Sequence, residues 1–392
     1  SRLARAGDSL IASAYVTNTV TLLPAGDQLQ HGAGGVARLA GAYNLDLSPD
    51  GKHVYVAARN HGEVASFTVG DDGSLTEIRW PSDQDNADSG ALTNVTVSLP
   101  DGESVYAVDS QFAMVRQYDR DTTTGVLTPR APMPLPLCGS RQPFPVDVVP
   151  SPDGKSVYVA DFQLGGASCL YQLDRAPDGT LTPAAIYDDA VLEGVEAIAI
   201  TRDGAYVYTA AHFAGKVTRW RRTLTGALEA PKDYAEKALN GAGGVAENAL
   251  DGAEVVVLSP DEKTVYASSP VTNSLVVFNR LEENGELTHR QTLTEADGYA
   301  LDDASGVAVH PNGLWVFIAA RDSGAISVFS VEADGTLKHA DTVKDPLALD
   351  WPNGLVMTPD GTHLLSVAVR SSALASWHMV QEDSDGCGGT CN

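Results

Sequence analysis

The chain has 392 residues, of which 43% are hydrophobic and 20% are charged, so it can bury a large core and carries too little charge for a disordered protein. Its 51 acidic and 26 basic residues give a formal net charge of −25. A surface this acidic repels nucleic acid and anionic lipid, so we expect neither as a partner. No apolar run reaches the roughly 18–20 residues that span a membrane.

Taken in chain order, one unit of roughly 50 residues recurs along the sequence. Its clearest copy, LDLSPDGKHVYVAARNHGEVASFTVGDDGSLTEI from Leu45, reads as strand, Pro-Asp-Gly turn, strand, polar loop, strand, Gly turn and strand. Similar segments begin at Val95, Val148, Ile198, Val256, Val307 and Leu355. A further copy lies at the N-terminus, where SLIASAYVTNTVTLL from Ser9 aligns with TVYASSPVTNSLVVF from Thr264.

This repeat predicts an all-β fold. A lone four-stranded sheet cannot bury both faces, whereas radial stacking buries each sheet against its neighbours, as in a β-propeller. A parallel β-helix is the competing repeat fold, but its units are shorter. We expect a propeller over residues 1–380 and a Gly/Cys-rich tail over 381–392. The units favour about eight four-stranded blades; seven is the alternative, because no convincing fourth strand follows Trp377 and the N-terminal strands could complete the last blade.

The four cysteines form two sequence pairs. Cys138 and Cys169 belong to one repeat, and we expect a disulfide between them. Cys387 and Cys391 lie in the tail DGCGGTCN, where their pairing stays open and zinc is a weak alternative. The chain begins at Ser1 rather than Met, so we expect a leader to have been removed and the protein to be secreted or periplasmic.

Several segments identify relatives. The stretches SPDGKHVYVAARN, VVFNRLEENGELTHR and HPNGLWVFIAARDSGAISVFSVEADGTL resemble the propeller lactonase family of 6-phosphogluconolactonase type, which shares its blade pattern with non-catalytic surface-layer and periplasmic propellers. The segment WPNGLVMTPDG, Trp351 to Gly361, resembles the metal-dependent gluconolactonase and strictosidine-synthase-like propellers. In that group the Asn of the PNG segment binds a divalent cation at the channel mouth, which implies this role for Asn353.

Propeller geometry places equivalent repeat positions in a ring around the channel. The position five residues before the Ser or Thr of each turn is occupied by Tyr43, Asn94, Val146, Glu196, Glu254, Ser305 and Asn353. Oxygen ligands suit a hard divalent cation, so Asn94, Glu196, Glu254 and Asn353 are candidate ligands, with Ca²⁺ as the expected ion. The alternative is a structural role, in which these side chains bond neighbouring backbone groups.

The ends of the second strands meet the same mouth. They bring Arg59, Ser110, Phe162, His212, Pro270 and Arg321, with Asp109 and Asp161 directly before two of them. Arg can hold a carboxylate or carbonyl oxygen, and His can act as an acid or base near neutral pH. We predict His212, Glu196 and Glu254 as catalytic residues. The predicted substrate-binding residues are Arg59, Arg321, Tyr43, Asp109 and Asp161.

Three functions fit this pattern. The first is a lactonase-like hydrolase that acts on a small lactone or sugar-derived ester at the channel mouth. The second is a non-catalytic extracellular propeller that binds a ligand or partner, and the third is a lyase or isomerase using the same residues. The serine-hydrolase GxSxG, the zinc HExxH and the haem-attachment CxxCH patterns are absent from the sequence. We expect a small-molecule substrate or ligand; the oligomeric state stays open, with a monomer favoured.

Overall fold

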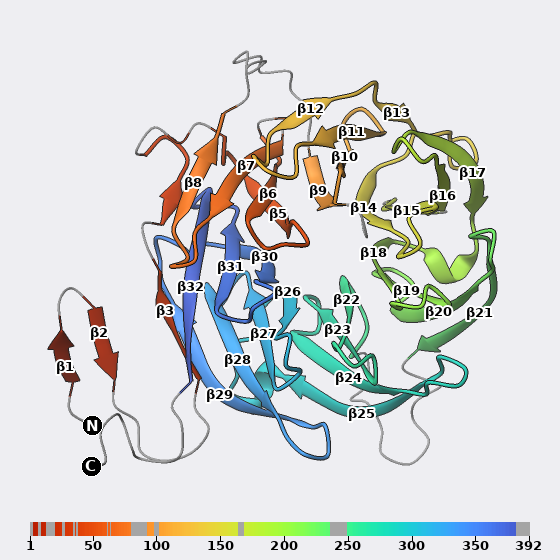
Figure 1. Cartoon of the computed structure of the whole chain (residues 1–392). Coiled ribbons are helices and arrows are strands. Elements are labelled where there is room, and N and C mark those ends of the chain that lie inside the picture. The colour runs from red at the N-terminus through yellow and green to blue at the C-terminus, as the bar shows by residue number, and fades with distance from the viewer. Residues whose placement is uncertain are drawn as a thin grey trace, which may run out of the picture.

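The computed structural model describes residues 3–6, 9–12, 20–25, 28–33, 36, 38–60, 62, 64–79, 92–97, 102–163, 168–235 and 249–381. Its strands form a ring of four-stranded antiparallel sheets around a central axis (Figure 1). The all-β propeller expected from the repeat is confirmed. The cysteines of the tail, Cys387 and Cys391, lie outside the described residues. Within the described part of the chain, no helix is long and apolar enough to cross a membrane.

We number the blades in chain order, each from its inner strand outward. Blade 1 comprises β5 (Ala42–Leu47), β6 (His53–Ala58), β7 (Val64–Val69) and β8 (Leu75–Ile78). Blade 2 comprises β9 (Leu92–Val97), β10 (Ser104–Asp109), β11 (Met114–Arg120) and β12 (Leu127–Pro129), and β13 (Met133–Pro134) also pairs with β11. Blade 3 comprises β14 (Pro145–Pro150), β15 (Ser156–Asp161), β16 (Leu170–Arg175) and β17 (Leu181–Tyr187).

Blades 4 to 6 follow the same order. Blade 4 comprises β18 (Val195–Ile200), β19 (Tyr206–Ala211), β20 (Lys216–Arg222) and β21 (Leu228–Ala235). Blade 5 comprises β22 (Val255–Leu258), β23 (Thr264–Ser269), β24 (Ser274–Arg280) and β25 (Leu287–Thr294). Blade 6 comprises β26 (Ala304–Val309), β27 (Trp315–Ala320), β28 (Ala325–Val331) and β29 (Leu337–Lys344). Two short 3₁₀ helices, η1 (Ala190–Leu192) and η2 (Glu295–Asp297), precede the inner strands of blades 4 and 6.

Blade 7 joins the two ends of the chain. It comprises β30 (Pro352–Met357), β31 (His363–Ala368), β32 (Ala373–Gln381) and, as outermost strand, β3 (Val20–Pro24), with β4 (Leu29–Gln30) also paired to β32. The ring therefore has seven blades, and the preferred count of eight gives way to the alternative. The reason is the missing fourth strand after β32, whose edge β3 covers. A separate hairpin pairs β1 (Leu3–Ala6) with β2 (Ser9–Ala12).

The closing strand is part of the core. Val20 and Leu22 of β3 are buried against Phe317, Leu364 and Trp377. Burying an aliphatic side chain stabilises the folded state by about 1.5–3 kcal/mol. This packing gives β3 a strong preference for blade 7 over a sheet of its own.

Polar clamps repeat between neighbouring blades. The Tyr55 hydroxyl on β6 donates to the Gly125 carbonyl of blade 2 (3.0 Å) and accepts from Nε of Arg120 (2.8 Å). Equivalent Tyr–Arg pairs are Tyr106–Arg175, Tyr158–Arg222 and Tyr208–Arg280. Because a buried hydroxyl must find a partner, these clamps fix the angle between blades and so the ring of inner strands.

The predicted disulfide is confirmed. Cys138, in the loop before β14, is bonded to Cys169, directly before β16, with the two Cα atoms 5.9 Å apart. The bond ties the long entry loop of blade 3 to the turn region between β15 and β16. Both elements lie at the mouth where the candidate site is built.

Candidate functional site

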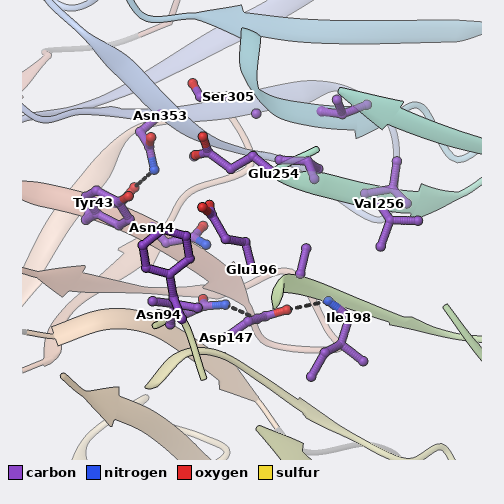
Figure 2. Close-up of a pocket in the computed structure, with 18 of the residues that line it drawn as sticks. Tyr43, Asn44, Asn94, Asp147, Glu196, Ile198, Glu254, Val256, Ser305 and Asn353 are labelled. Atoms are coloured by element: carbon purple, nitrogen blue, oxygen red, sulfur yellow. Dashed lines mark hydrogen bonds between the residues drawn. The ribbon is translucent and has the colours of Figure 1, made fainter. Parts of the chain in front are cut away.

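The seven ring residues line one cavity on the propeller axis. This cavity has a volume of about 340 Å³ and is lined by all seven positions, together with Asn44, Arg59, Asp147, Phe144, Phe162 and inner-strand aliphatic residues. Figure 2 shows Tyr43, Asn94, Glu196, Glu254 and Asn353 converging from separate strands. Cavities of this size hold small ligands.

A backbone irregularity aims these side chains. The antiparallel register shifts around the ring residue in five inner strands, at Tyr43, Val146, Glu196, Ser305 and Asn353. An extra residue in a strand bends it and re-aims the side chain, and such bulges are common beside active sites. The repeat spacing indicated the positions, whereas the bulges themselves leave no clear signal in the sequence.

Glu254 is held by a bidentate ion pair. Arg321 donates from Nη1 and Nη2 to its two carboxylate oxygens at 3.0 and 2.7 Å, and Nη2 also contacts Oδ1 of Asp303 at 2.6 Å. Nη1 lies 3.3 Å from Oδ1 of Asn353, and the guanidinium carbon lies 5.0 Å from the centre of the Trp351 ring. Both Nη atoms of Arg321 therefore already bond protein side chains.

Burial changes the protonation of Glu254. Loss of water and the nearby Glu196 carboxylate raise its pKa to about 7, against the lowering effect of Arg321. Its side chain is 13% exposed, so the charged form depends on the ion pair. Near neutral pH Glu254 is poised between its neutral and charged forms.

Glu196 has a different partner. Nδ1 of His212 lies 3.3 Å from Oε1 of Glu196, at ion-pair distance, although this contact lacks hydrogen-bond geometry. The Glu196 carboxylate raises the pKa of His212 above its usual value, against the effect of burial. Glu196 lines the cavity and His212 does not, so Glu196 is the member of the pair that a ligand would meet.

Arg59 and Tyr43 form a second polar wall. The Arg59 guanidinium lies over the Tyr43 ring, 4.8 Å from its centre, and both residues line the cavity. Burial raises the pKa of Tyr43 to about 12, so its hydroxyl stays protonated. Among the described residues, no carboxylate lies within ion-pair distance of Arg59. Its donors are available to a ligand.

The two amides of the ring bond protein groups. Asn94 donates to Oδ1 of Asp147, whose other oxygen accepts from Ile198 N at 2.8 Å. Burial raises the pKa of Asp147 to about 6. Asn353 donates to the Tyr43 carbonyl at 2.8 Å. These bonds link neighbouring blades, although they go to a carboxylate and a backbone carbonyl rather than to backbone N–H groups.

This arrangement is a poor fit for a cation. Of the four predicted calcium ligands, only Glu196 lacks a hydrogen-bonded protein partner among the described residues, while Glu254 already has a bidentate cation. Within the described ranges, the one close group of three potential ligand side chains is Cys138, Asp161 and Cys169, and the disulfide occupies both sulfurs. The calcium prediction itself stays untested, and we derive no step from a metal.

Two predicted substrate-binding residues lie away from the cavity. Asp109 is buried and accepts from Nε and Nη2 of Arg116 at 3.0 and 2.7 Å. Asp161 is buried too, and its Oδ1 accepts from Phe144 N at 2.5 Å. Both carboxylates therefore stabilise the loops around them through hydrogen bonds.

The sequence reasoning missed some residues at the site. Asp303 and Trp351 contact Arg321, and Phe144 lines the cavity. Asp303 and Trp351 each come two residues before a ring position. Both have positive φ angles, 60° and 66°. Extending the ring analysis upstream by two residues would have found them.

Comparison with known proteins identifies the family of the chain. Residues 8–139, 141–299 and 256–385 match the family described as lactonase, 7-bladed beta-propeller, and the chain belongs to this family. Its curated relatives include the 6-phosphogluconolactonases of Enterobacter sp. (strain 638) and Klebsiella pneumoniae (strain 342). The first is 22% identical over 83% of this chain and 91% of the relative, and the second is 22% identical over 84% and 92%.

A solved structure shows the same fold. The periplasmic gluconolactonase PpgL of Pseudomonas aeruginosa superposes with a TM-score of 0.61 at 19% identity, covering 88% of this chain and 92% of that one. At this identity the likeness concerns the fold alone. The family supports a lactonase type of hydrolase, while the substrate must be argued from the cavity.

Proposed function

We propose that the chain is a lactonase that opens the ring of a small lactone or sugar-derived ester in the axial cavity. One observation carries the proposal: Glu196 and Arg59 line the same cavity, and neither is consumed by a structural ion pair with a permanently charged partner. In the hydrolysis of an ester, a carboxylate can serve as the base and a free guanidinium can stabilise the oxyanion.

The chemistry follows from these roles. Glu196 takes a proton from water, and the resulting hydroxide attacks the lactone carbonyl carbon. Arg59 stabilises the charge that develops on the carbonyl oxygen. The tetrahedral intermediate collapses with cleavage of the ring C–O bond, and Glu196 returns the proton to the leaving alkoxide. The product is a hydroxy acid, which ionises and releases one proton. His212 acts as a positioning residue for Glu196.

The test is acid release from glucono-δ-lactone, corrected for spontaneous ring opening. We expect the wild type to accelerate it, and His212→Gln to lower kcat/KM about tenfold or more while changing the pH profile. His31→Gln, at an exposed histidine, is the matched control. Added EDTA should leave the rate unchanged, since Arg321 already neutralises Glu254. Absence of turnover with every lactone tried would end the proposal.

A non-catalytic binding propeller is the second candidate. The observation that favours it is the number of ring side chains bonded within the protein, including Asn94, Asn353 and Glu254. Such a protein would bind a ligand at the mouth without changing it. Saturable binding of a lactone, measured by calorimetry, without acid release would select this function.

We also propose an extracytoplasmic location with a small-molecule substrate. The Cys138–Cys169 disulfide supports this, because such bonds persist in oxidising compartments. Fractionation of the cells that naturally make the protein tests it: the protein should appear outside the cytoplasm, with Cys138 and Cys169 unreactive toward thiol reagents.

A further inference from the structure

Phenylalanines divide into two groups in this protein. Phe67, Phe278, Phe317 and Phe329 are fully buried in the core. By contrast, Phe144 and Phe213 are 36% and 40% exposed, and Phe144 and Phe162 line the axial cavity. We call Phe144, Phe162 and Phe213 the aromatic wall.

The aromatic wall lies beside the proposed base. The Phe162 and Phe213 rings have centroids 5.3 Å apart, and the His212 ring lies 5.9 Å from Phe162 and 4.9 Å from Phe213. Because His212 contacts Glu196, an apolar surface adjoins the point where water would be activated. Exposed aromatic side chains at the edge of a cavity supply contact area at little conformational cost.

Hydrogen bonds and the disulfide hold the backbone of the aromatic wall in place. Phe162 N donates to the Phe144 carbonyl at 3.0 Å, and Phe144 N donates to the buried carboxylate of Asp161. Asp161 N in turn donates to the Cys169 carbonyl at 3.0 Å, next to the disulfide with Cys138. Hydrogen bonds and a covalent link thus fix the two loops before any ligand arrives, which reduces the entropy lost on binding.

The charges around the cavity disfavour a phosphorylated ligand. Glu196 and Glu254 both face it, and Arg321 is occupied. Arg59 is the one cationic side chain among the described residues that line the cavity, and no carboxylate in the described part of the chain lies within ion-pair distance of it. Because Arg321 balances the charge of Glu254, a phosphate dianion would meet one guanidinium, Arg59, and the uncompensated carboxylate of Glu196. A neutral ring with an apolar substituent instead meets Arg59 at its carbonyl and the wall at its substituent.

We propose that the aromatic wall binds an aryl or branched alkyl substituent of the substrate, so that the protein acts on uncharged, apolar-substituted lactones rather than phosphorylated sugar lactones. This inference rests on the proposed lactonase function. It departs from the substrates that the names of the 6-phosphogluconolactonase relatives state. It also assigns to Asp161 and the disulfide the task of positioning the specificity wall.

The experiment compares kcat/KM for three probes: unsubstituted δ-valerolactone, its 6-phenyl derivative and 6-phosphogluconolactone. We expect the phenyl derivative to exceed the unsubstituted ring by at least about 10-fold, because a single added methylene in an apolar pocket already gives about 10- to 200-fold. Phe162→Ala, at an aromatic residue that lines the cavity, should lower this phenyl-to-unsubstituted ratio about tenfold. Leu224→Ala, at a leucine 97% exposed, should keep it.

The outcomes separate the two claims. A higher kcat/KM for the phosphorylated lactone, or a ratio unaltered in Phe162→Ala with the fold intact, overturns the inference and leaves the lactonase proposal standing. No turnover of any probe overturns both. If Phe162→Ala loses its fold, Phe144→Ala provides the same test at the other aromatic residue that lines the cavity, and an unaltered ratio there is equally decisive against the wall.

Discussion

Removing the charge of Glu254 should change how stability depends on pH. The pKa of Glu254 is raised from 4.5 to about 7, which corresponds to about 3 kcal/mol. An acid with a raised pKa binds its proton more tightly in the folded state, so this stability is present below about pH 4.5 and is lost as the pH rises through about 7. Glu254→Gln cannot titrate, so this loss should vanish in the variant.

Urea unfolding at about pH 5 and about pH 7.5 measures the effect. The fall in unfolding free energy between these two pH values should be smaller in Glu254→Gln than in the wild type by roughly 2–3 kcal/mol. Glu282→Gln, whose side chain is 65% exposed, should behave as the wild type. The same pH dependence in wild type and Glu254→Gln would refute the reasoning, because it would mean that Arg321 keeps Glu254 charged throughout.

Further outcomes follow from the closure, the disulfide and the buried carboxylates. Leu22→Ala should lower the unfolding free energy by about 2–5 kcal/mol, measured by urea unfolding, because it empties core space between β3 of blade 7 and the residues that pack on it, such as Trp377 and Phe317. Cys138→Ser should cost about 2–5 kcal/mol, and a reducing agent should lower the melting temperature of the wild type but not of the variant. Asp147→Asn should flatten the loss of stability as pH rises from about 4 through about 6, because the raised pKa of Asp147 has the same sign as that of Glu254.

The sequence predicts which positions form the ring around the cavity, but not which side chains contact one another there. Spacing relative to the turns located all seven cavity positions, since equal places in a repeat meet at one axis. It could not show that Arg321 is occupied by Glu254 and Asp303, because the contact with Glu254 depends on how blades 5 and 6 pack and the contact with Asp303 depends on how the loop before β26 folds. Nor could it place Arg59 over Tyr43 as the available cation.

Blade number illustrates the same limit. The N-terminal segment carries a blade-like pattern, and local pattern alone favours an eighth blade. The number of blades is instead determined by tertiary packing. The edge of β32 would be open without β3, which pairs with it, and Leu22 of β3 fills the core beside Trp377. The disulfide between Cys138 and Cys169 was accessible from the sequence because both residues fall within one repeat.

The central claim is that the axial cavity is where a lactone ring is opened. Its most direct test is kcat/KM for lactone hydrolysis in Glu196→Gln and Glu254→Gln, measured beside their melting temperatures. The account predicts a loss of about 10²–10⁴-fold in Glu196→Gln with an unchanged melting temperature, because the general base is gone while the fold is kept. Full activity in Glu196→Gln would contradict it, and full activity in both variants with stability alone altered would identify the ring as structural.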